Sequence, residues 1–161
     1  MRNTLIVAIA TVLAQAVGLA TVQITPPSAV RGKAQEYILK VKNDTKAVTV
    51  SIQLDAPDGV SIADAPDPEV GTVEIKKEGN RISSIIWTRE IKPAATADFR
   101  FVVRNPTIGE EIVWPVIEKK ANGSLTRWIG KPKQKNAAPV TKLTPSDSEP
   151  PDDGGRPIDT R

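Results

Sequence analysis

Apolar residues recur at every second position along most of the chain between residues 21 and 130. The run KAVTVSIQLD is the clearest case, because Val48, Val50, Ile52 and Leu54 share one face while polar residues take the other. A period of two is typical of half-buried β-strands. The same pattern predicts strands in VQIT, EYILKVKN, EVGTVEIKK, RISSIIWT, ADFRFVVRN, EEIVWPVIEKK and SLTRWI.

Short polar turns separate these runs, and Asn122-Gly123 is the strongest hairpin signal among them. About eight short strands, each with one apolar face, predict two antiparallel sheets packed face to face. The expected fold class is therefore all-β, an immunoglobulin- or fibronectin-like antiparallel β-sandwich. Pro115 interrupts EIVWPVIEKK and has no N–H to donate, so we expect an edge strand or a bulge there.

The first 20 residues have the layout of a secretory signal peptide. Arg2 precedes the uncharged stretch TLIVAIATVLAQAVGL, and small residues follow. Cleavage after Ala20 would make Thr21 the first residue, and cleavage after Ala16 is the alternative. A membrane anchor is disfavoured because Gln15 and the small residues shorten the apolar run below the roughly 20 residues that a spanning helix needs.

Beyond residue 130 the composition changes to KPKQKNAAPVTKLTPSDSEPPDDGGRPIDTR. This segment is rich in Pro, Lys, Asp and Gly, which predicts a disordered tail over residues 131–161. Its lysines precede its carboxylates, as in a tether, a solubilising tail or a weak docking segment. The predicted organisation is thus a signal peptide at 1–20, a sandwich at 21–130 and the tail.

Composition excludes several kinds of chemistry. The chain contains no Cys and no His, and its only Met is Met1. No disulfide can form, and no His or Cys is available as a catalytic base or nucleophile, so we predict a protein that is not an enzyme. The net charge of +3 is spread over interleaved positive and negative residues, which argues against a nucleic-acid partner. Trp87 and Trp114 lie on strands among Ile and Val and are expected in the core.

The order of several segments resembles the YcnI-like copper-binding domain family, a group of secreted bacterial β-sandwiches. These segments are VQITP with GKAQEYILKVKND, then DGVSI, RISSIIWTREIKP with ADFRFVVRNP, and the final EIVWPVIEKKANGSLTRWIGKP. In that family the first residue after signal cleavage is a His whose amine and imidazole hold one copper ion. The resemblance also implies a Glu ligand on the second strand and a Trp beside the metal on the last strand. Such nitrogen and oxygen ligands suit Cu(II).

This chain departs from the family at those positions. The resemblance places Thr21 at the His and Gln35 at the Glu, and only Trp128 matches. Glu36 is a weak substitute, since adjacent strand residues point to opposite faces. Trp128 itself is expected as an aromatic on the sandwich surface or under a loop, with the wall of an inherited pocket as the alternative. No cofactor is therefore expected, apart from copper bound weakly through the Thr21 amine and a carboxylate.

The predicted function is that of a periplasmic or secreted accessory module associated with copper homeostasis, in which the family's copper site is lost. Its partner would be an envelope protein, in the first place one that handles copper, and no membrane span would follow signal cleavage. One alternative is a copper metallochaperone with an unconventional site that uses the Thr21 amine, Glu36, tail carboxylates or a partner's ligands. Another is a structural or adhesive sandwich that docks through a sheet edge or its tail.

Overall fold

The computed structural model describes residues 22–146, so the predicted signal peptide, Thr21 and residues 147–161 lie outside the described range. Within it the chain forms strands and no α-helix. Correspondingly, the described part contains no helix long and apolar enough to cross a membrane.

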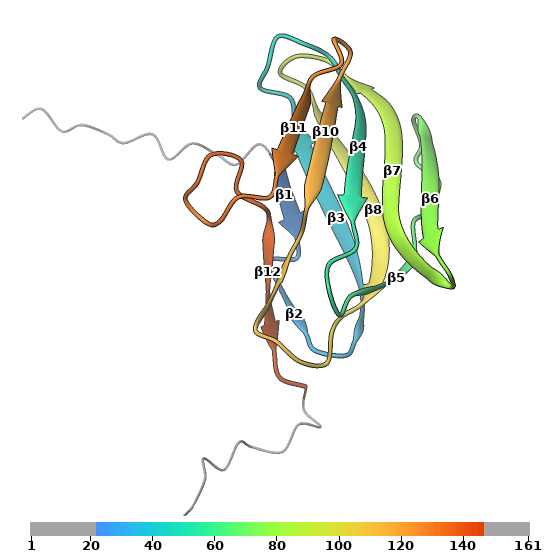
Figure 1. The fold of residues 1–161 in the computed structure, drawn as a ribbon, viewed down its shortest axis with the longest axis vertical. Coiled ribbons are helices and arrows are strands. Elements are labelled where there is room, and N and C mark those ends of the chain that lie inside the picture. The colour runs from blue at the N-terminus through green and yellow to red at the C-terminus, as the bar shows by residue number, and fades with distance from the viewer. Residues whose placement is uncertain (1–21, 147–161) are drawn as a thin grey trace, which may run out of the picture.

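Two sheets face each other, one behind the other in Figure 1. The four-stranded sheet has the order β1 (Val22–Thr25), β3 (Ala34–Lys42), β8 (Thr96–Arg104) and β5 (Ser61–Asp64). The five-stranded sheet has the order β11 (Leu125–Trp128), β10 (Val116–Lys120), β4 (Thr49–Asp55), β7 (Arg81–Ile91) and β6 (Thr72–Glu78). All pairs in these two sheets are antiparallel, as predicted.

A third, three-stranded sheet closes the lower part of the sandwich in the view of Figure 1. Its order is β2 (Ser28–Val30), β12 (Val140–Thr144) and β9 (Glu111–Val113). The β2–β12 pair is parallel, the one departure from antiparallel pairing among the strands of the described range. The last strand of the chain thereby pairs with a strand close to the first.

The middle of the sandwich is filled by an aromatic cluster. Its rings belong to both layers and lie 5.1 to 6.2 Å apart between centroids, in stacked, tilted and edge-on arrangements. All are at most 1% exposed, which confirms the core positions predicted for two of the tryptophans. The members of this aromatic cluster are Tyr37, Trp87, Phe99, Phe101 and Trp114.

The predicted face of the fourth strand is only half right. Ile52 and Leu54 are fully buried, but Val48 and Val50 are half-buried, and Thr49 between them is fully buried. The pairing register of β4 with β7 shifts between Thr49 and Ser51, and such an irregularity reverses the side-chain alternation. A hydroxyl therefore points into the sandwich where the alternation predicts a valine.

Pro115 divides one predicted strand into two. β9 ends before it and lies at the edge of the three-stranded sheet, which fits the edge position expected beside a proline. β10 begins after it and lies between β11 and β4 in the five-stranded sheet. The proline thus marks the point where the chain changes sheets.

The predicted start of the tail at residue 131 is wrong, because the fold continues through β12 to Thr144. Leu143 is buried, and the fully buried Thr141 accepts a hydrogen bond of 3.0 Å from the indole N–H of Trp114. The backbone N–H of Trp114 also bonds the carbonyl of Pro139 at 2.9 Å. Hydrogen bonds to distant residues therefore stabilise β12 as a strand, although the composition of residues 131–161 is typical of a disordered tail.

Candidate functional site

The start of β1 lies at the end of β3, because the two strands run antiparallel. Val22 pairs with Val41, and Thr25 pairs with Ile38. The start of β1 therefore lies at the end of the sandwich near Val41. Thr21 itself lies outside the described residues.

Gln35 and Glu36 lie at the other end of β3. Gln35 pairs with Val103, and it precedes Val41 by six strand positions, or about 20 Å. Its side-chain amide donates to the backbone carbonyl of Glu36 at 2.8 Å. Glu36 points to the outer face, where its carboxylate contacts the guanidinium of Arg100 at 3.0 Å. Neither residue can share a site with the start of β1.

Asp44 lies just beyond the end of β3 that pairs with the start of β1. It follows β3 by two residues, and its Oδ1 contacts Nζ of Lys42 at 3.0 Å with both side chains about half exposed. No local sequence pattern marks Asp44, because its place beside β1 depends on strand pairing. Antiparallel pairing of the first two long strands is the signal that could have found it, since it sets the beginning of one against the end of the other.

Trp128 is packed into the sandwich at the end of β11. It pairs with Val116, is 8% exposed and belongs to the same hydrophobic core as Val22 and Ile24 of β1. Its indole N–H is buried and has no hydrogen-bond acceptor among the described residues. Its burial excludes the expected position on the sandwich surface, and a buried unpaired donor costs about 1 to 3 kcal/mol.

A polar network of Asn43, Thr49, Glu118 and Lys120 fills the interior at the end of the sandwich near Val41. Nζ of Lys120 contacts Oε1 of Glu118 at 2.5 Å, and both side chains are at most 4% exposed. Oγ1 of Thr49 donates to the same carboxylate oxygen at 2.5 Å and accepts from Lys120 at 2.9 Å. The amide oxygen of Asn43 accepts a third bond of the ammonium at 3.0 Å. The inward-turned Thr49 thus links two charged residues of β10 to the end of β3.

Asn43 connects this polar network to the turn that carries Asp44. Its amide nitrogen donates to the carbonyls of Ala47 and Ile91, each at 2.8 Å. Its amide oxygen also accepts from the backbone N–H and the hydroxyl of Thr45, at 3.1 and 2.7 Å. A single buried side chain therefore holds residues 43–47 in place beside the start of β1.

The sequence model of a protein family described as a domain of unknown function (DUF1775) matches residues 21–144, most of the chain. The chain belongs to the DUF1775 family. The copper-binding protein CutI of Bacillus subtilis (strain 168) is 23% identical to it over 128 residues, which are 78% of this chain and 63% of CutI. The chain thus matches less than two thirds of CutI's length.

A solved structure confirms the fold class. An uncharacterized protein from Nocardia farcinica with an immunoglobulin-like fold matches with a TM-score of 0.68 at 17% identity, covering 76% of this chain and 96% of that one. The DUF1775 match and the likeness to CutI also confirm the predicted YcnI-like family. The family match ends at residue 144, where β12 ends.

The described residues of this DUF1775 protein do not fit a tight copper centre. The whole chain lacks His and Cys, and the Asp44 carboxylate is already paired with Lys42. Residues 22–146 contain no group of three or more His, Cys, Asp or Glu side chains placed to hold a metal ion. Cu(I) would find neither thiolate nor thioether among residues 22–146, and Cu(II) would find no imidazole.

A groove of about 590 Å³ lies at the opposite edge of the sandwich, beside β8. It exists because β5 pairs only with Val102, Val103 and Arg104, so no described strand pairs with the rest of β8 on that side. Gly71 anchors the loop that borders the groove, since its φ is 95° and a Cβ there would lie 2.2 Å from the carbonyl oxygen of Thr88. The lining mixes both charges over an aromatic floor: Lys40, Glu69, Trp87, Arg89, Asp98 and Phe99.

Proposed function

We propose that this DUF1775 protein is an exported, non-catalytic accessory module that serves copper handling without itself holding copper tightly. Support for the copper-related role comes from the likeness to CutI, a copper-binding protein. Support for export comes from the signal-peptide layout of residues 1–20, which would place the protein in the periplasm or outside the cell. Its partner would be an envelope protein that handles copper.

The observation that carries the proposal is the register of β1 against β3. It separates Gln35 and Glu36 from the start of β1 by about 20 Å, so neither can replace the ligand that the family resemblance implies. Asp44 lies at the end of β3 near Val41, and its ion pair with Lys42 opposes coordination of a cation because the ammonium already neutralises the carboxylate. With Thr21 in the place of His, this end would offer Cu(II) an amine and the exposed Asp44 carboxylate but no imidazole.

A copper titration of the purified protein tests this proposal. The N-terminal residue is first determined by intact mass, and Cu(II) and Cu(I) are then titrated against a competing chelator with tryptophan fluorescence as the readout. We expect no binding tighter than about 1 μM. Tight binding of one equivalent would overturn the proposal in favour of a copper carrier with an unconventional site.

Two variants locate any site that the titration finds. Asp44→Asn removes the carboxylate at the start of β1, and Glu36→Gln makes the same chemical change at the other end of β3. A carrier site built from the terminal amine would be weakened by Asp44→Asn and by acetylation of the amine, and would not respond to Glu36→Gln.

A further inference from the structure

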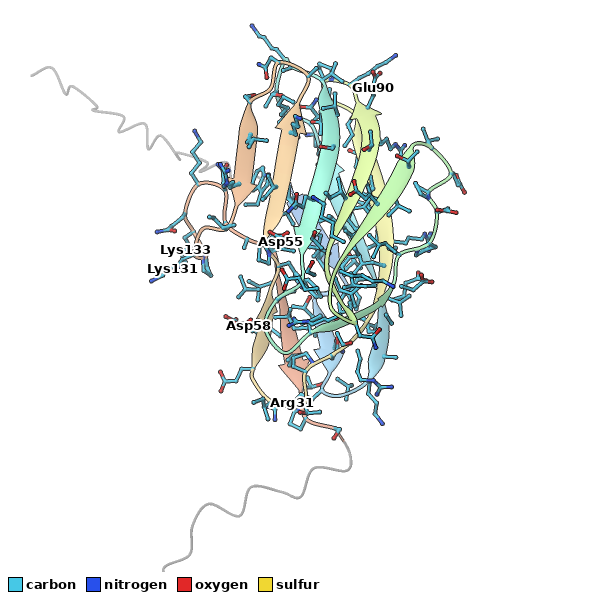
Figure 2. The ribbon with its side chains drawn as sticks, turned by 45° about the vertical axis from the view of Figure 1, so that its right-hand side comes forward. Arg31, Asp55, Asp58, Glu90, Lys131 and Lys133 are labelled. Atoms are coloured by element: carbon cyan, nitrogen blue, oxygen red, sulfur yellow. The ribbon has the colours of Figure 1, made fainter. Side chains whose placement is uncertain are left out.

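A lysine-rich loop projects from the sandwich directly after β11. We call residues 131–135, with the sequence KPKQK, the lysine loop. Lys131, Lys133 and Lys135 are all exposed, and Figure 2 shows the first two at the tip of the loop with their side chains directed away from the sheets. Figure 1 shows the same loop standing out from the molecule between β11 and β12.

Backbone hydrogen bonds close the base of the lysine loop. The N–H of Gly130 donates to the carbonyl of Asn136 at 3.1 Å, and the N–H of Ala138 returns to the carbonyl of Gly130 at 2.9 Å. Inside the loop the N–H of Gln134 donates to the carbonyl of Lys131 at 3.1 Å, and the Gln134 side chain accepts from the Lys131 N–H at 2.8 Å. The loop is therefore preformed, and presenting its lysines to a partner needs little ordering.

The backbone of the lysine loop carries a lysine where glycine would be favoured. Pro132 and Lys133 are the two central residues of the turn from Lys131 to Gln134, and Lys133 has a φ of 69°. Proline first and a positive φ second are the features of a type II turn, whose second position prefers Gly or Asn. A lysine in this conformation strains the backbone, and strained residues cluster at functional sites, although Ala94 has a similar φ of 64°.

The surroundings of the loop are positive and partly apolar. From Lys119 to Ser146 the sequence contains seven Lys or Arg residues and no Asp or Glu. Lys119 and Arg127 are exposed on the neighbouring β10–β11 hairpin. Two apolar side chains lie among these cations, Ile129 at 60% exposed and Leu125 at 46%.

We propose that the lysine loop and Ile129 dock this protein onto a bilayer surface that contains anionic phospholipids. The loop carries only lysines, and lysine binds phosphate as a mobile point charge without the fixed bidentate geometry of arginine, which suits the shifting headgroups of a fluid bilayer. A projecting loop with cations around an exposed apolar residue fits the headgroup region of a bilayer, into which the apolar side chain inserts. This inference goes beyond the accessory role proposed above and does not depend on copper.

Vesicle co-sedimentation with the full chain tests the proposal. We expect binding to vesicles of phosphatidylcholine mixed with phosphatidylglycerol, none above baseline to phosphatidylcholine alone, and loss of binding at high salt. All variants share one N-terminus, so differences in vesicle binding between them measure the contribution of the lysine loop. Removing one lysine should weaken binding about fivefold, which corresponds to about 1 kcal/mol.

Lys133→Gly is the most informative variant, because it should weaken binding while raising the melting temperature of the protein through relief of the turn. The pair Lys131→Gln and Lys135→Gln should weaken binding about 25-fold, the product of two such losses. The matched control is Lys76→Gln with Lys77→Gln, an equal change in charge on the exposed strand β6 at the opposite edge of the five-stranded sheet. This control should leave binding unchanged.

Three outcomes would overturn the proposal. The first is an absence of preference for phosphatidylglycerol, and the second is an equal loss of binding in the β6 control, which would leave only net charge as the cause. The third is binding that is unaffected by Ile129→Ser and is displaced by polyglutamate at matched charge. That result would assign the loop to an acidic protein partner.

Discussion

Two parts of the sandwich interior are equally buried and are built from opposite chemistry. The aromatic cluster in the middle is apolar, and two of its polar groups have neutral hydrogen-bond partners. Tyr37 donates its hydroxyl to Asn105 at 2.9 Å, and Trp114 donates its indole N–H to Thr141 at 3.0 Å. The polar network at the end near the start of β1 instead buries an ammonium and a carboxylate.

The two regions make different contributions: the aromatic cluster stabilises the fold, and the polar network positions residues. Burial of aromatic area stabilises the fold directly, because apolar surface leaves water. A buried ion pair contributes little net stability, since the cost of removing both charges from water offsets their attraction. What the polar network adds is geometry: it holds Asn43, and through Asn43 the turn that carries Asp44.

The largest effect is expected from breaking the polar network on one side. Lys120→Met leaves the Glu118 carboxylate buried with only the hydroxyl of Thr49 as a partner. We expect a loss of about 3 to 5 kcal/mol in the free energy of unfolding, measured by urea denaturation. A loss below about 1 kcal/mol would mean that water reaches the carboxylate in solution.

A double variant sharpens the comparison. Replacing both charges, with Glu118→Leu and Lys120→Met, should restore most of the stability lost in Lys120→Met, because no charge is then left buried alone. If the double variant is no more stable than the single one, the polar network stabilises the fold through its hydrogen bonds. The polar network would then contribute stability as the aromatic cluster does.

A smaller effect is expected from the one titratable group of the aromatic cluster. Burial raises the pKa of Tyr37 from 10.0 to about 12, although the hydrogen bond to Asn105 lowers it in part. Between these values the unfolded chain loses the phenol proton and the folded protein keeps it, so stability falls as the pH rises. The contribution is complete below pH 10, and its loss by pH 12 amounts to about 2 kcal/mol.

Tyr37→Phe isolates this contribution. The variant loses the hydrogen bond to Asn105 at every pH, but it should lack the Tyr37 share of the decline above pH 10. Denaturation of both proteins from about pH 9 to 12 measures the difference in slope. Equal slopes would show that the decline comes from other groups.

The strands were predictable where their pattern is local, and the exceptions depend on partners distant in the sequence. The alternation along Tyr37, Leu39 and Val41 predicts a half-buried strand without knowledge of its neighbours. β12 has only five residues within a stretch rich in Lys and Pro, and its anchors are Trp114, β2 and β9. The inward turn of Thr49 depends in the same way on the register of β4 with β7.

The candidate site was less predictable, because it is defined by strand pairing. Trp128 lies near the core of β1, in keeping with its position in the family resemblance. Gln35 was assigned by counting along one strand, and the register of β1 with β3 places it about 20 Å from the start of β1. No local pattern marks Asp44 or the contact of Lys120 with Glu118, since each acquires its neighbours only through the sheets.

The smallest effect is expected from an ion pair on the exposed outer face of the sandwich. The Glu36 carboxylate and the Arg100 guanidinium are 3.0 Å apart, but unlike Glu118 and Lys120 their side chains are 52% and 62% exposed. Glu36→Gln should therefore change the free energy of unfolding by about 0.5 kcal/mol or less, and high salt should remove even that change. Urea denaturation beside Lys120→Met makes the contrast direct. A loss comparable to that of Lys120→Met would show that burial does not determine how much an ion pair matters in this sandwich.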